Sequence, residues 1–121
     1  MKIDFTQEQE SEPLPPGEYE VEIVEAAEDK SDNDNPLFRL SHEILEGGHA
    51  GKRVSDVVTV TPQSLWRVKA LLAACGLEAQ GKLEVKAETF LEKRLRIMTG
   101  IRSYEGRKIS HVRRYKNSIP F

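Results

Sequence analysis

The stretch TPQSLWRVKALLAACG, residues 61–76, decides the fold of this 121-residue chain. Thr61 predicts a helix N-cap, and Pro62 suits the first helical position because its N–H would have no partner there. Apolar side chains then recur at helical spacing until a glycine ends the run: Leu65, Val68, Leu72, Cys75 and Gly76. The stretch therefore predicts one helix in the middle of the chain.

Three β-strands are predicted before this helix. From Gly17 onward, Tyr19, Val21 and Ile23 alternate with glutamates, which indicates a strand with one solvated face. A second alternation runs over residues 38–44, after a turn-rich loop at residues 29–36 (DKSDNDNP), and both Phe38 and Tyr19 fall on the apolar phase expected in a core. Residues 52–60 (KRVSDVVTV) follow a glycine-rich turn and are rich in β-branched residues, which favour strands.

A short helical turn and a hairpin are predicted after the helix. Residues 86–93 (KAETFLEK) suit the helical turn, and residues 94–102 alternate apolar side chains with arginines. The sequence YEGR at residues 104–107 supplies the glycine of a hairpin turn, and residues 108–116 return as the last strand. Three strands, a helix and a hairpin are the element order of the OB-fold, a five-stranded Greek-key barrel. The sequence therefore predicts a mainly β, OB-fold-like barrel with one helix between strands three and four.

Residues 1–16 are predicted to be an acidic, proline-containing flexible arm, because they show no apolar periodicity. Residues 17–116 then form the folded domain, and residues 117–121 form a short tail. The acids of the arm are expected to compete with phosphate for a cationic groove: Asp4, Glu8, Glu10 and Glu12.

Length and composition predict one domain in a reducing compartment. The chain is long enough for a single modest core, and 38% of its residues are hydrophobic. Cys75 is the one cysteine, so it has no disulfide partner within the chain. No run approaches 18 apolar residues and no signal-peptide pattern occurs, so we expect a cytoplasmic protein without a membrane partner.

Charge is sorted along the sequence. Residues 1–60 hold 5 Lys/Arg and 15 Asp/Glu, whereas residues 61–121 hold 13 and 5, and the formal net charge is −2. Between residues 93 and 116, nine Lys/Arg stand against one acid, Glu105. Outward cations also keep exposed sheets soluble, but a merely solvated face usually interleaves both signs. The excess therefore indicates a surface for a polyanion.

The ordered motifs resemble a family of small phage and prophage proteins, long catalogued as a domain of unknown function and regarded as OB-fold single-stranded DNA-binding proteins. The resemblance rests on PLPPGEYEVEIVEAAE (13–28), ILEGGHAGKRV (44–54), TPQSLWRVKALLAACGL (61–77), FLEKRLRI (90–97) and YEGRKISHVRRY (104–115). It implies binding to single-stranded DNA in phage replication or recombination inside a bacterial host cell, with replication or recombination proteins as further partners.

The candidate contacts come from chemistry rather than from the resemblance. Phosphates need cations spaced along a groove, and bases need planar platforms. Tyr104 is expected at the hairpin tip as a platform, whereas Tyr115 suits either a platform or the core. Trp66 is expected to be partly buried, and base stacking is its alternative role. The expected nucleic-acid-binding residues are Arg94, Arg96, Arg102, Tyr104, Arg107, Lys108, Arg113, Arg114, Tyr115 and Lys116, extended by Lys52 and Arg53 unless these only solvate a turn.

No motif supports catalysis, a cofactor or a metal. Residues 47–53 (GGHAGKR) fail as a phosphate-binding P-loop, because Arg53 stands where Ser or Thr should bind magnesium and a strand follows. The histidines lie in three separate elements without a second cysteine, which disfavours zinc. Ser110 and His111 are adjacent strand residues that point to opposite faces. We therefore expect a binding protein, not an enzyme.

A protein-interaction module is the alternative function. In that hypothesis the acidic and basic halves bind other copies of the chain, or a recombinase or polymerase. The tail offers a related choice, since residues 119–121 (Ile-Pro-Phe) resemble the end of bacterial single-stranded DNA-binding proteins, which partner enzymes capture. Here basic residues precede the tripeptide instead of an acidic run, so Phe121 is either a partner hook or a plug that covers the barrel.

Overall fold

The computed structural model describes residues 14–77, 81 and 85–118. The predicted C-terminal hook or plug and most of the predicted arm therefore lie outside the described residues. In chain order the elements are β1 (Glu18–Lys30), β2 (Pro36–Ile44), β3 (Arg53–Thr59), η1 (Pro62–Ser64), α2 (Leu65–Ala74), η2 (Ala87–Phe90), β4 (Arg94–Tyr104) and β5 (Arg107–Asn117), where η marks a 3₁₀ turn.

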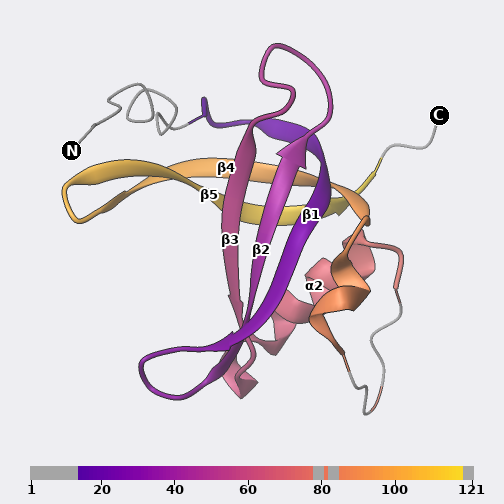
Figure 1. Ribbon diagram of the computed structural model, residues 1–121, viewed down its shortest axis with the longest axis vertical. Helices are drawn as coiled ribbons and strands as arrows, with labels where there is room; N and C mark the ends of the chain where they lie inside the picture. Colours follow the sequence, from indigo (N-terminus) through magenta and orange to yellow (C-terminus); the bar gives the residue numbers. More distant parts are fainter. Residues whose placement is uncertain (1–13, 78–80, 82–84, 119–121) are drawn as a thin grey trace, which may run out of the picture.

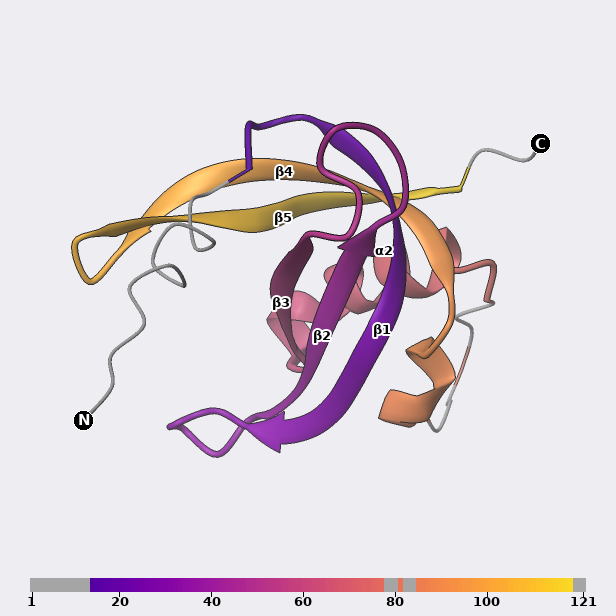
Figure 2. The same ribbon diagram turned by 45° about the horizontal axis from the view of Figure 1, so that its top comes forward.

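The strands form one antiparallel five-stranded sheet in the order β3-β2-β1-β4-β5. The sheet is strongly curved, and the β4–β5 hairpin crosses the other three strands and projects beyond them (Figures 1 and 2). The mainly β class, the five strands and the helix between β3 and β4 are confirmed.

The helix begins and ends where the sequence predicts. Thr61 is the N-cap of the 3₁₀ turn that leads into α2, and its backbone N–H donates to the Ser64 hydroxyl at 3.0 Å. Gly76 follows the helix with φ +80°, a left-handed conformation that favours glycine. The short turn expected in residues 86–93 is confirmed as η2.

A β-bulge breaks the alternation of apolar residues in β1, so the pattern did not predict the second half of this strand. Val21 and Ile23 pair with Ile44 and His42, but the register shifts after Ile23. Because a bulge inserts one unpaired residue, the inward phase moves from odd to even positions. The strand therefore continues to Lys30, beyond the end of the alternation that the sequence shows.

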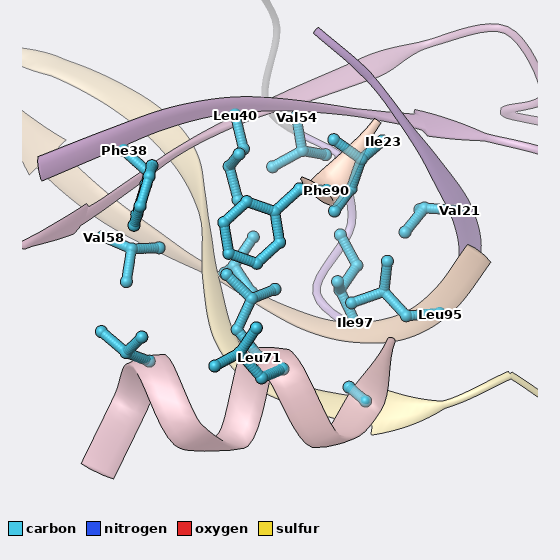
Figure 3. Packing of buried hydrophobic residues seen from close by; sticks show 14 of the residues in the cluster. Val21, Ile23, Phe38, Leu40, Val54, Val58, Leu71, Phe90, Leu95 and Ile97 are labelled. Carbon is cyan, nitrogen blue, oxygen red and sulfur yellow. The ribbon is translucent and has the colours of Figure 1, made fainter. Parts of the chain in front are cut away.

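One cluster of apolar side chains fills the concave side of the sheet (Figure 3). Phe90 from η2 is fully buried at its centre, and its ring meets Phe38 edge-on at 5.1 Å between centroids. Leu71 of α2 packs against the same cluster from below. Phe38 therefore belongs to the core as predicted, and Tyr19 is half-buried and packs against the same cluster, with its ring edge-on to His49.

The folded part begins before the predicted boundary at residue 16. Leu14 is only 4% exposed, and its N–H donates to the Ser110 hydroxyl at 2.7 Å. The Thr99 N–H donates to the Gly17 carbonyl, so the segment extends the contact with β4. A single leucine between prolines shows no periodicity, which is why the prediction placed residues 14–16 in the arm.

Candidate nucleic-acid interface

A tight turn fixes the β4–β5 hairpin. Glu105 and Gly106 both have positive φ, at 50° and 78°, as the twist of a two-residue hairpin turn requires. Tyr104 therefore pairs with Arg107, and the register continues to Leu95 opposite Asn117.

Most outward-facing positions of β4 carry or face a lysine or arginine. Leu95, Ile97 and Thr99 point into the core, so the alternate positions 94, 96, 98, 100 and 102 share the outer face. Directly opposed residues of antiparallel strands share a face, which adds Lys116 beside Arg96 and Arg114 beside Met98. Arg107 joins them because it lies two positions before Ile109, which opposes Arg102. Successive positions on this face are about 6.8 Å apart. We call this row the arginine ladder: Arg94, Arg96, Arg102, Arg107, Arg113 and Arg114. Its proximal end consists of Arg94 and Arg96, and its distal end, toward the hairpin turn, consists of the other four arginines.

A second bulge completes the ladder. Met98 pairs with Arg114 and Thr99 with Val112, so Arg113 is the extra residue of β5. A Cβ placed on Gly100 would lie 2.6 Å from Arg113 Cδ, which shows that the Arg113 side chain crosses the outer face over this glycine. Regular alternation would send the adjacent Arg113 and Arg114 to opposite faces, whereas the bulge brings both to one.

The proximal end of the ladder is neutralised by acids of β1. Arg94 Nε lies 3.1 Å from Glu22 Oε1, and Arg96 lies 3.3 Å from carboxylate oxygens of both Glu18 and Glu20. Lys116 donates to Glu18 at 2.5 Å, and this hydrogen bond and charge hold the pKa of Glu18 below its ordinary value. The proximal end therefore contains several basic residues, but the carboxylates of β1 nearly balance their positive charge in the folded structure.

The distal end has no such partners. β1 begins at Glu18, which pairs with Met98, so beyond that position no described strand pairs with the edge of β4 that faces away from β5. Within the described residues no ion pair involves the exposed cations at this end: Arg102, Arg107, Arg113 and Arg114. Lys108 is exposed but pairs with Ser103, which places it on the opposite face of the hairpin.

A buried polar network lies beneath the proximal end. Asp56 of β3 is 5% exposed, and its carboxylate accepts hydrogen bonds from the Tyr115 hydroxyl, from Arg67 Nη2 at 3.0 Å and from His42 Nε2 at 3.1 Å. Arg67 Nη2 also donates to the Val112 carbonyl at 3.0 Å. The network thus joins β2, β3, β5 and α2 through one carboxylate. Sequence analysis missed this group because nothing in the sequence distinguishes Asp56 from the other acidic residues of the strands.

Tyr115 belongs to this network and not to the surface. Burial, reinforced by the neighbouring Asp56 charge, raises the pKa of Tyr115, so its hydroxyl remains a donor. Of the two roles left open for Tyr115, the structure favours the core. The other candidate platform, Tyr104, ends β4 as expected, but its side chain lies outside the described structure.

Trp66 differs from the expectation of partial burial. The indole lies on the first turn of α2 and is 69% exposed. The helix turns its Val68, Leu71 and Leu72 face to the core, and Trp66 falls on the opposite side, since consecutive residues are about 100° apart.

Lys52 and Arg53 do not extend the ladder. Arg53 lies 3.0 Å from Glu25 and 3.6 Å from Glu43, so acids of β1 and β2 neutralise it. Lys52 is exposed in the turn before β3, and its N–H donates to the His49 carbonyl.

The described residues contain no group of three or more His, Cys, Asp or Glu side chains placed to hold a metal ion. Burial raises the pKa of the Cys75 thiol to about 11, so the thiol stays protonated near neutral pH. Over the same residues, no helix has the length and apolarity needed to cross a membrane.

The fold and this face define a class: a small antiparallel β protein whose projecting hairpin carries a row of arginines. The family described as "Protein of unknown function (DUF669)" matches residues 1–120, and the chain belongs to this family. No curated protein matches the sequence.

Proposed function

We propose that this chain binds single-stranded DNA along the distal arginine ladder, without strong sequence preference. The observation that carries the proposal is the row of Arg102, Arg107, Arg113 and Arg114 on one face, none of them ion-paired within the described part of the chain. Each guanidinium can donate two hydrogen bonds to a phosphate, and regular spacing suits a periodic polyanion.

The OB-fold is the fold that we propose for this domain. The strand order with a helix between β3 and β4 supports it, as do the sheet curvature and the side-chain contact of Tyr115 with Asp56, which links the outer strands β5 and β3. OB-folds bind oligonucleotides on the face of strands two and three and on the loops between strands one and two and between strands four and five. The hairpin turn of this chain is the last of these loops.

Phosphate contacts are the main source of affinity in this proposal. Four contacts on a single strand release counterions, so log K should fall against log salt with a slope of about −3, at about −0.7 per contact. Replication or recombination in a phage-infected bacterial cell is the process that we propose for this activity.

A fluorescence-anisotropy titration with labelled oligo-dT at two salt concentrations tests the proposal. Binding that weakens strongly with salt supports it. Absence of binding at low salt would instead favour the assembly function, in which the acidic and basic surfaces join proteins.

A further inference from the structure

We infer that Trp66 is the base-stacking platform for a single strand bound on the distal arginine ladder. The inference rests on the proposed function and adds a second kind of contact to it. The ladder supplies charge for phosphates, and a single strand also exposes bases, which need a flat apolar partner.

Trp66 is the exposed member of the described aromatic side chains. Phe38 and Phe90 are buried in the core, and the Tyr115 hydroxyl is held by Asp56. Tyr19 is half-buried, and its hydroxyl donates to the Pro15 carbonyl at 2.5 Å. Among the aromatic side chains that the structure describes, only the indole of Trp66 leaves most of a ring in solvent.

The helical turn that carries Trp66 is attached to β5 through the next residue, Arg67. Arg67 donates to the backbone carbonyl of Val112 in β5 and to the Asp56 carboxylate. The Cα atoms of Trp66 and Arg67 are about 3.8 Å apart. The first turn of α2 is therefore anchored to β5 next to the bulge that presents Arg113 and Arg114.

The second edge of β5 lies between the two features. β5 is an outer strand in the sheet order, so no described strand forms a hydrogen-bonded ladder with this edge, although the Tyr115–Asp56 hydrogen bond brings β3 close to it. A DNA strand that lies over Arg113 and Arg114 has to cross this edge of β5 to place a base on the indole. That path uses the same protein segment for phosphates and bases.

Leu65 provides the structural contrast on the same helical turn. It is 52% exposed, but it lines a cavity of about 810 Å³ together with Phe38, Val60 and Leu72. Trp66 is not among the residues that line this cavity. The exposure of Leu65 thus belongs to an apolar recess, whereas Trp66, about 100° further round the helix, faces solvent.

Intrinsic fluorescence tests the inference directly, because Trp66 is the one tryptophan of the chain. Oligo-dT should quench its emission in parallel with the anisotropy change of a labelled oligo-dT. Trp66→Ala should weaken oligo-dT binding about 5- to 150-fold, as the loss of one stacked base predicts, without changing the salt slope. Trp66→Phe should restore most of the affinity, and the matched control Leu65→Ala should keep it.

An oligomer of abasic deoxyribose phosphates separates stacking from charge. It should bind wild type and Trp66→Ala equally, without quenching. Full oligo-dT binding with unchanged emission, or unchanged affinity of Trp66→Ala, would overturn the inference and leave the ladder proposal standing. Failure of oligo-dT to bind at all would overturn the proposed function itself.

Discussion

The two ends of the arginine ladder have the same side chains on the same face of one hairpin, yet different surroundings. Arg96 at the proximal end is about one quarter exposed and lies between Glu18 and Glu20. Arg102 at the distal end is exposed, and no acid pairs with it among the described residues. Where β1 runs beside β4, the arginines contribute to the fold, and where β1 stops, they are available to a ligand.

The comparison also explains the sorted charge of the sequence. The acidic residues of β1 and the basic residues of β4 lie far apart in the chain but meet because these strands pair antiparallel. Part of the basic excess is therefore structural, and the phosphate contacts that we propose are confined to the distal part.

The largest expected effect is a loss of folding stability when the buried Asp56 network beneath the proximal end is broken. Asp56→Ala removes the carboxylate that three donors share and leaves the Arg67 charge unpaired near the core. Breaking a buried ion pair costs about 3–5 kcal/mol. Denaturant unfolding should show this loss, whereas the salt slope of DNA binding by the folded fraction should stay unchanged. A loss below 1 kcal/mol would mean that the network does not hold β5 to β3.

The next largest effect is expected at the distal end, on binding. Arg102→Ala combined with Arg113→Ala removes two phosphate contacts and should weaken oligo-dT binding about 10- to 100-fold, since each charged hydrogen bond contributes about 1.5 kcal/mol or less after screening. The slope against log salt should flatten by about 1.4. The melting temperature should stay the same because neither side chain is ion-paired with any residue that the structure describes; unchanged affinity would show that these arginines only solvate the hairpin.

A gain of function is expected from removing one proximal acid. Glu18→Gln takes the negative charge from between Arg96 and Lys116 and extends the open ladder by one position. Oligo-dT should bind a few-fold more tightly, with a slope steeper by about 0.7 for one added phosphate contact. Thr59→Ala, on β3, is a control that changes no charge. Equal slopes for Glu18→Gln and wild type would contradict the view that β1 acids limit the binding surface.

The smallest effect is expected from the N-terminal segment. Deleting residues 1–13 removes four acids but keeps Leu14, which is anchored on Ser110 of the hairpin. Leu14 thus attaches the chain to the distal half of the hairpin, and we expect the acids that precede it to compete with phosphate for the ladder. Affinity should rise modestly at low salt and stay the same at high salt. A variant with the four acids changed to Gln or Asn should behave like the deletion, and equal low-salt affinity of all three proteins would argue against competition.

Local sequence signals predicted the elements well and their long-range partners poorly. Alternation, turn glycines and the Thr61 cap gave the strands, the hairpin and the helix. The bulge at Ile23 and the burial of Leu14 depend on packing that no periodicity records. The candidate contacts show the same limit, because whether Arg96 or Arg102 is paired depends on where β1 ends relative to β4.

Other site features differ in how far they depended on tertiary structure. Asp56 becomes the centre of a buried network only when β3, β5 and α2 meet. The exposure of Trp66, in contrast, follows from helical spacing, because Trp66 lies opposite the Val68 and Leu71 face that the helix turns inward. The adjacent Arg113 and Arg114 share a face only through a bulge that the sequence does not announce.

The matched pair Arg96→Ala and Arg102→Ala tests the central claim most directly, by salt-dependent oligo-dT binding measured with anisotropy beside thermal unfolding. Arg102→Ala should reduce the affinity and flatten the slope of log K against log salt by about 0.7, from about −3, at unchanged melting temperature. Arg96→Ala should lower the melting temperature and keep the slope. Equal losses of affinity and slope in the two variants, or a wild-type slope near zero, would contradict the division of the ladder into a structural end and a binding end.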